Sequence, residues 1–483
     1  MSSTPDSHRP ASDLFLSATL SAEDAAGYLA SRGFHDPVLA DERLQLMAGE
    51  LVVRESLGAM AEQLIAALGR SPDPDRALAG LSRYFATCVS QQTFLRHLSA
   101  DDRALSVLTH LFGASPLLTD TLTRNPEYFH WLLPQLDRNA QTPEDRERYV
   151  HALLVTLQGL SSSLNVLRRL KRREVLRIAA REILGRDPVG SAMEQLSDLA
   201  DLLIQQSLDL VCQDMCAAAG RDGLPGTIAV IATGKLGAEE LDYASGLDLL
   251  YVYEAAEPGD ASVDEFFQDI ARRLTVALVD DSVESELYRV DVPARPGGPI
   301  TRLAFSLQQW ESGVMRSGTP GRFALLKARR IAGDRALGAR FMALAEVFVH
   351  GEPLDADAAE EMFRLQPGRG ALKTIELFTQ TLQLMHGTDH PGLRSPNTLG
   401  VVDALAFAGL ITRESQEALK AAFTFLRTVE HRVQLVQESD LRRPDTAELA
   451  CCARQLGFRT VDALNAELDA HRSRIDALCR IES

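Results

Sequence analysis

The sequence lacks long apolar runs and has few cysteines. No stretch approaches the about 20 apolar residues that a membrane-spanning helix needs, and the polar segment 1–10 has no apolar signal-peptide core. None of the six cysteines belongs to a double Cys-x-x-Cys arrangement. Cys212 and Cys216 lie one helical turn apart, but no histidine is nearby, so we favour helix packing over a metal site. We expect a cytoplasmic protein with reduced thiols and no membrane contact.

Positive charge is also in deficit. Lysine and arginine total 50 against 67 aspartates and glutamates, which gives a net charge of -17. Because an acidic surface repels phosphate backbones, we expect no nucleic-acid partner. Apolar residues make up 45% and charged residues 24%, the balance of an ordinary globular protein. A chain of 483 residues predicts roughly two to four packed units, and we expect three.

Helical periodicity runs from about Leu14 to Gly220, where apolar residues recur every three or four positions. Within Leu164 to Leu184 an apolar stripe alternates with a basic one. The basic stripe consists of Arg168, Arg169, Lys171, Arg172, Arg173, Arg177 and Arg181. It either faces the phosphates of a nucleotide or an acidic partner, or it is an ordinary surface paired with neighbouring acids. We favour the ordinary surface.

The periodicity changes near residue 227. Short segments rich in β-branched or aromatic residues predict strands at 227–233, 247–253 and 286–292, with a glycine turn and short helix at 234–241 and a helix at 263–279. After residue 308 we expect helices to the end, with breaks at 351–354, 366–370 and 386–398. The predicted fold class is mainly α with an inserted α/β core. The predicted domains are an N-terminal helical region (1–110), a helical subdomain (111–225), the α/β core (226–338) and a C-terminal helical bundle (339–483).

The order strand, glycine turn, short helix and acidic strand is typical of sites that cradle a triphosphate and its magnesium ions. Glycines let backbone N–H groups approach the phosphates, and carboxylates supply hard oxygen ligands. Gly234, Lys235 and Gly237 form the turn, and Lys235 is a candidate phosphate contact. On the next strand, positions 246 and 248 project to one face. Position 248 is Asp and position 246 is Gly.

These residues belong to a longer series of motifs through which the chain resembles the glutamine synthetase adenylyltransferase family. The core motifs are Gly234-Lys235-Leu236-Gly237, Glu240-Leu241, Ser245-x-x-Asp248-Leu249, Tyr288-Arg289-Val290-Asp291, Arg295-Pro296, Arg322, Ala324 to Arg329, and Gly333-Asp334. Upstream and downstream helices add Arg172-Arg173-Glu174, Arg177-Ile178-Ala179, Leu196 to Ala200, Ile375-Glu376, Gln380, Leu426-Arg427, Glu430-His431-Arg432 and Gln434. The resemblance extends from about Ser115 to Ile475.

The resemblance implies a nucleotidyltransferase sheet of the DNA polymerase β type, flanked by helical bundles. Members carry two such units, one attaching AMP to a tyrosine of glutamine synthetase and one removing it by phosphorolysis; this chain resembles a single half-length copy. Implied partners are glutamine synthetase, a PII-type signal protein and ATP with Mg²⁺. The implied metal ligands are Asp248, which bridges two ions, and Asp291. The implied nucleotide-binding residues are Gly234, Lys235, Gly237, Ser245, Arg295 and Lys327.

Several positions depart from the family pattern. Gly246 stands where the family has a metal-binding aspartate, and losing a ligand should weaken both metal binding and catalysis. The other departures are Ala232, Ala238, Pro293, Pro320-Gly321 and Gly370-Ala371-Leu372-Lys373. Two hypotheses follow. In the first, the chain is an adenylyltransferase, and Asp242 or Glu254 could replace the missing metal ligand. In the second, it is a non-catalytic regulator. A helical scaffold unrelated to nucleotides leaves the glycine turn unexplained, and an RNA-directed nucleotidyltransferase does not suit the acidic surface.

Overall fold

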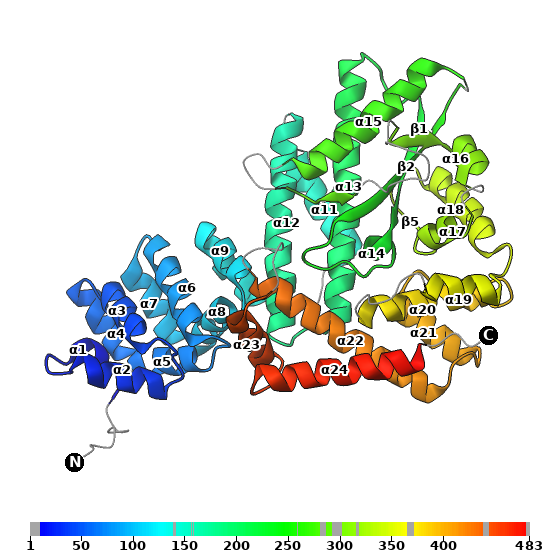
Figure 1. Ribbon diagram of the computed structural model, residues 1–483. Coiled ribbons are helices and arrows are strands. Elements are labelled where there is room, and N and C mark those ends of the chain that lie inside the picture. The colour runs from blue at the N-terminus through cyan, green and yellow to red at the C-terminus, as the bar shows by residue number, and fades with distance from the viewer. Residues whose placement is uncertain are drawn as a thin grey trace. The chain divides into compact units, whose positions relative to one another are not determined.

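The computed structural model describes residues 10–138, 142–155, 157, 159–257, 259–280, 286–291, 302–314, 318–364, 371–437 and 444–479. These residues are mainly helical, with a small sheet inserted after the first thirteen helices, which confirms the predicted fold class (Figure 1). In the part of the chain so described, no helix has the length and apolar character to cross a membrane.

The chain divides into two compact units, each built from separate stretches of sequence. Unit 1 comprises residues 1–139, 176–188 and 429–466, and unit 2 comprises 140–175, 189–428 and 467–483. The candidate site lies in unit 2. The boundaries at residues 110, 225 and 338 stay predictions.

The N-terminal helices begin at recognisable signals. Asp36, Asp73 and Ser115 each precede a proline, and each side chain accepts a hydrogen bond from the backbone N–H three residues on. Proline fits the first helical position because it needs no N–H partner there. The helices are α1 (Asp13–Leu16), α2 (Ala22–Ser31), α3 (Pro37–Met47), α4 (Leu51–Ala59), α5 (Ala61–Gly69), α6 (Pro74–Thr87), α7 (Gln91–Ala100), α8 (Asp102–Ala114), α9 (Pro116–Arg124), α10 (Glu127–Gln135), α11 (Pro143–Leu154), α12 (Leu160–Ile183) and α13 (Val189–Ala218).

Unit 1 is held together by apolar packing and by buried charged groups. The ring of Tyr84 lies 5.4 Å from that of Phe94, and its hydroxyl donates to the carbonyl oxygen of Pro126 at 2.8 Å. Glu182 is buried between His431 and Arg432, whose Nδ1 and Nη1 atoms lie 2.9 and 2.8 Å from its carboxylate oxygens. The downstream motif at 430–432 therefore has a structural partner within its own unit.

The sheet of unit 2 has the strand order β3-β2-β1-β5, with β4 also paired to β2. β1 is antiparallel to β2 and β5, whereas β3 and β4 are parallel to β2. The strands are β1 (Gly226–Thr233), β2 (Leu247–Ala255), β3 (Val290–Asp291), β4 (Ala304–Ser306) and β5 (Arg329–Gly333). The elements between them are α14 (Gly234–Gly237), α15 (Ala261–Val279), α16 (Leu307–Val314) and α17 (Gly318–Leu325).

Helices cover both faces of this sheet, which explains why its strands are almost continuously apolar. Ile231 and Leu250 belong to a buried cluster with residues of α16, α17 and α18 (Arg335–His350). On the other face, Tyr253 stacks on Phe267 of α15 with ring centroids 4.8 Å apart. Figure 1 shows the sheet between α13 and α15 on one side and α16 to α18 on the other. The later helices are α18 (Arg335–His350), α19 (Ala356–Arg364), α20 (Ala371–His386), α21 (Thr398–Phe407), α22 (Arg413–Val436), α23 (Thr446–Gln455) and α24 (Val461–Leu478), with a short 3₁₀ helix at Pro391–Leu393.

Two expectations about the strands need correction. The prediction of helices only after residue 308 is wrong, because β5 pairs with β1 at residues 329–333. The predicted strand at 286–292 is shorter in the described part, where only residues 290 and 291 pair with β2. The breaks at 351–354 and 386–398 are confirmed, and the break at 366–370 lies outside the described residues.

Candidate functional site

The carboxylate of Asp248 lies directly against the glycine turn. β1 ends at Thr233, which pairs with Asp248 at the start of β2, and the chain turns at Gly234 with a φ of 59°. A Cβ atom at Gly234 would lie only 2.3 Å from Asp248 Oδ2. The left-handed backbone favours glycine here, and any other residue would also displace the carboxylate of Asp248. The structure brings the predicted turn and the predicted acid together.

The second predicted acid lies beside the first on the neighbouring strand. β3 runs parallel to β2, and the register pairs Asp248 with Asp291. The N–H of Leu247 donates to the carbonyl oxygen of Arg289 at 2.8 Å, and the Arg289 guanidinium donates to the carbonyl oxygen of Ala244. The side chain of Asp291 and all of Arg295 lie outside the described part of the structure, as do Pro293 and Gly370 among the departures.

Lys235 and Ser245 meet at Asp242. The ammonium group of Lys235 contacts Asp242 Oδ2, and Asp242 Oδ1 accepts hydrogen bonds from the Ser245 backbone and hydroxyl at 2.8 and 2.7 Å. The Asp242 side chain is fully buried, whereas that of Lys235 is 23% exposed. This ion pair fixes the loop that leads into β2. The Lys235 charge is thus already balanced within the protein.

Gly237 and Lys327 meet through the backbone of Lys327. A Cβ atom at Gly237 would lie 1.8 Å from the carbonyl oxygen of Lys327, so only glycine fits at this crossing. The Lys327 ammonium points into a buried cluster, where its Nζ lies 3.3 Å from Glu240 Oε2 and 3.3 Å from Thr398 Oγ1. Among the predicted nucleotide-binding side chains that the structure describes, that of Lys327 lies in the interior.

This interior group, called the Glu240 cluster, consists of Glu240, Lys327, Glu376, Thr398 and Arg427. Glu240 Oε1 accepts the backbone N–H of Thr398 at 2.6 Å, and Arg427 Nη2 lies 2.6 Å from Glu376 Oε1 and 3.9 Å from Glu240 Oε2. Burial alone would raise the pKa of Glu376, but Lys327, Arg427 and Lys373 lower it to about 2. The motif residues Glu240, Glu376, Lys327 and Arg427 thus form one buried group with two negative and two positive charges.

Sequence reasoning missed the residues that join this cluster to the turn. Asn397 Oδ1 caps α21 by accepting from the Gly400 N–H at 3.0 Å, and its Nδ2 donates to the carbonyl oxygen of Ala238 at 3.2 Å. An asparagine that directly precedes an apolar helix is a cap signal, but nothing in the sequence indicates its contact 159 residues away.

The described carboxylates fall short of a two-metal site. Among the residues placed in the structure, no three His, Cys, Asp or Glu side chains are grouped to hold a metal ion. Position 246 supplies no side chain, and the two suggested replacements are engaged elsewhere. Asp242 holds Lys235 and the 242–245 loop, and Glu254, at the far end of β2, binds Arg340 at 2.6 and 2.9 Å. The donor set centres on Asp248 and the strand position of Asp291.

The basic stripe of α12 binds its own neighbours. Arg168 is buried and its Nη2 donates to Asp280 Oδ2 at 3.3 Å, while Lys171 Nζ lies 4.2 Å from the centre of the Tyr288 ring and contacts the carbonyl oxygen of Leu287. Burial lowers the pKa of Lys171 to about 8, although Glu286 opposes this shift. These contacts support the interpretation of the stripe as a paired structural surface.

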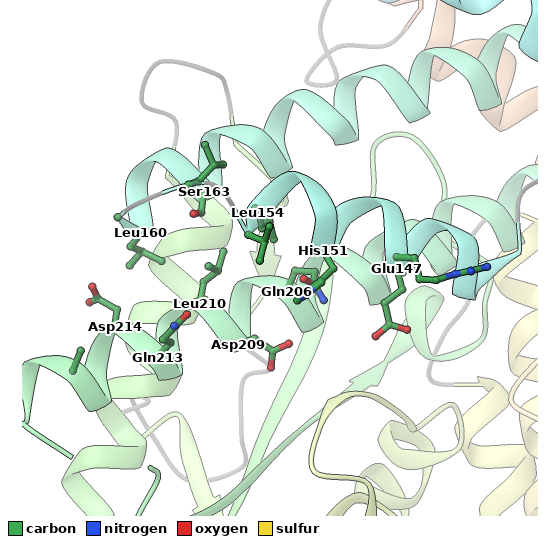
Figure 2. Close-up of a pocket in the computed structure, with 15 residues that line it drawn as sticks. Glu147, His151, Leu154, Leu160, Ser163, Gln206, Asp209, Leu210, Gln213 and Asp214 are labelled. Carbon is green, nitrogen blue, oxygen red and sulfur yellow. The ribbon is translucent and has the colours of Figure 1, made fainter. Parts of the chain in front are cut away.

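A separate hollow of about 840 Å³ lies between α11 and α13 (Figure 2). Its lining includes Glu147 and His151 from α11 and Asp209 and Asp214 from α13. Desolvation raises the pKa of Asp209 and the nearby Glu147 adds to the rise, while a hydrogen bond from Gln205 opposes it. None of the predicted site residues lines this hollow.

Comparisons with known proteins match the chain in two adjoining segments. Residues 105–344 match the family model of glutamate-ammonia ligase adenylyltransferase, and residues 355–481 match that of the GlnD PII-uridylyltransferase. Similar proteins include bifunctional glutamine synthetase adenylyltransferase/adenylyl-removing enzymes. That of Streptomyces coelicolor is 32% identical over 89% of this chain and 44% of its own length, and that of Rhodopseudomonas palustris is 30% identical over 93% and 45%. The chain spans a little under half the length of these relatives.

Proposed function

Because this chain belongs to the glutamine synthetase adenylyltransferase family, we propose that it binds ATP at the glycine turn and moves AMP onto or off a tyrosine of glutamine synthetase. The observation that carries the proposal is the Asp248 carboxylate against Gly234, on a strand in register with Asp291. The relatives are named for both directions of transfer, so the proposal covers attachment and removal.

In this proposal Asp248 and Asp291 are the ligands of a divalent cation. Mg²⁺ is commonly held by one or two carboxylates together with substrate phosphates, and it would neutralise the charge that develops on a transferred phosphoryl group. Asp248 is held in place by the β1–β2 register, and Asp242 shapes the loop before it through Lys235 and Ser245.

Because Gly246 has no side chain to bind a metal ion, it lowers the expected rate of AMP transfer. Losing one electrostatic contact in a reaction site costs about 3 kcal/mol, roughly a hundredfold in rate, and losing a metal ligand should be at least as harmful. We therefore propose AMP transfer well below that of a site with the full set of acids.

A second candidate function is a non-catalytic regulator that docks on glutamine synthetase or a PII-type signal protein. Two observations favour it: position 246 has no side chain, and the Lys235 ammonium is paired with the buried Asp242. The match of residues 355–481 to the GlnD PII-uridylyltransferase model motivates the PII-type partner.

Purified protein, glutamine synthetase, Mg²⁺ or Mn²⁺ and ATP labelled in its AMP moiety test the first function. The expected result is slow labelling of glutamine synthetase, or slow release of AMP from the modified form when phosphate is added, with Asp248→Asn inactive in the same assay. If neither reaction occurs but the protein binds glutamine synthetase in a pull-down, the regulator is the correct function.

A further inference from the structure

The second of the two matched segments, residues 355–481, forms hydrogen bonds with the residues that follow the glycine turn. Asn397 Nδ2 donates to the carbonyl oxygen of Ala238, and the N–H of Thr398 donates to Glu240 Oε1. Both donors belong to the start of α21, within residues 355–481, whereas the turn lies within residues 105–344. The two segments therefore meet at residues 238–240.

The backbone between these contacts is in a costly conformation. Glu239 has a φ of 60°, the left-handed region that costs a residue other than glycine about 1 to 2 kcal/mol. Such strain persists only where the surroundings fix the chain on both sides. Here the fixed neighbours are Ala238, through its carbonyl oxygen, and Glu240, through its side chain and its N–H, which donates to the carbonyl oxygen of Lys235 at 2.8 Å.

The contact between Glu240 and the start of α21 depends on the negative charge of the carboxylate. The Glu240 side chain is 0% exposed, and its carboxylate faces the N-terminus of α21, where helix N–H groups favour negative charge. Lys327, just before β5, and Arg427 of α22 balance its charge. Neutralising one member of a buried ion cluster leaves its partners uncompensated, which is far more costly than the loss of a surface pair.

We infer that Glu240 is a positioning residue for the glycine turn, and that α20 to α22 complete the candidate nucleotide site through it. The inference rests on the proposed function, because it takes the turn to be the place where nucleotide binds. It also assigns a role to Thr398 and Asn397, which touch the turn segment without being part of it.

Hydrogen exchange of the whole 483-residue chain without nucleotide tests the inference. The amides of Ala238, Glu239 and Glu240 donate hydrogen bonds within the turn, so peptides covering residues 234–241 report its opening. Glu240→Gln should speed their exchange about tenfold or more, as expected for weakening a hydrogen bond to a buried charged group. Thr398→Val, a milder change that keeps the backbone N–H, should act in the same direction.

The matched control is Glu182→Gln, the same change at a buried glutamate of unit 1. It should leave exchange at 234–241 unchanged. The inference is overturned if folded Thr398→Val and Glu240→Gln proteins exchange there at the wild-type rate, or if Glu182→Gln accelerates exchange equally. Titration with Mg²⁺ and ATP separates the two proposals: a wild-type protein that binds no ATP refutes the proposed function and leaves the exchange result standing.

Discussion

Gly234 and Gly220 both adopt a left-handed backbone, but their surroundings differ. Gly234 has a φ of 59° and faces the Asp248 carboxylate. Gly220 has a φ of 62°, and among the described residues no atom beyond its chain neighbours would lie within 4 Å of a Cβ added there. Alanine at either site has to adopt the left-handed backbone, but only alanine at 234 also meets Asp248. The difference in stability between the two variants therefore measures the effect of the Asp248 carboxylate.

We expect Gly220→Ala to lower the free energy of unfolding by about 1 kcal/mol and Gly234→Ala to lower it by more, because only the second also displaces a carboxylate. Urea unfolding measures both. Adding Asp248→Ala should reduce the penalty of Gly234→Ala and leave that of Gly220→Ala unchanged. Equal penalties for the two alanine variants would mean that Asp248 does not approach the turn.

Because Lys235 is paired with Asp242, substitutions at Lys235 can show whether its role is structural or phosphate-binding. Asp242 is fully buried, and removing the partner of a buried charge costs roughly 3 to 5 kcal/mol. We expect Lys235→Met to destabilise the protein strongly and Lys235→Arg to do so much less, as measured by thermal unfolding. A lysine that serves only a phosphate would change ATP affinity and leave the stability unaltered.

Glu376 gives the protein a defined response to acid. Its pKa is lowered to about 2 in the folded state because three cations outweigh burial, so its stabilising contribution is present above the unfolded pKa near 4.5 and is lost as the pH falls toward 2. The shift corresponds to about 3 kcal/mol. Unfolding free energies between pH 6 and pH 3 should fall less steeply in Glu376→Gln than in the wild type.

Among the elements, α21 contributes to the site through its cap. Asn397 uses its carbonyl oxygen to cap the helix and its amide nitrogen to hold Ala238. Asn397→Asp should keep the cap and lose the second contact, whereas Asn397→Ala should lose both and cost about 1 kcal/mol more. Urea unfolding together with exchange at residues 234–241 distinguishes the two effects. Identical exchange at the turn in wild type and Asn397→Asp would contradict the role given to this contact.

The sequence pattern predicted β1, β2 and α15 because their apolar periodicity is local. It did not predict β5, since the strand starts with two arginines and follows a helical motif. It also overextended β3, of which residues 290 and 291 pair among those that the structure describes. The sequence could not predict the Glu240 cluster for a different reason. Lys327 lies 87 residues from Glu240 in the sequence, and Thr398 lies 158 residues away. Local periodicity therefore cannot predict that these side chains are in contact. Motif resemblance flagged Glu240, Glu376 and Arg427 without indicating that they touch.

At the scale of the whole molecule, the chain offers one tryptophan reporter in each unit. Trp131 lies in unit 1 and Trp310, buried against Phe341, lies in unit 2. In the single-tryptophan backgrounds Trp131→Phe and Trp310→Phe, we expect Glu240→Gln to lower the unfolding midpoint reported by Trp310 most, and Glu182→Gln that reported by Trp131. Equal shifts at both reporters would show that the two units unfold as one.

The central claim is that position 246 is a vacated metal-ligand position beside Asp248. Calorimetric titration of ATP in the presence and absence of Mg²⁺ tests it on the wild type, Gly246→Asp and Asp248→Asn. We expect weak Mg²⁺-dependent binding in the wild type, at least about tenfold tighter binding in Gly246→Asp, and none in Asp248→Asn. Binding that Gly246→Asp leaves unchanged, or that persists in Asp248→Asn, would contradict the account.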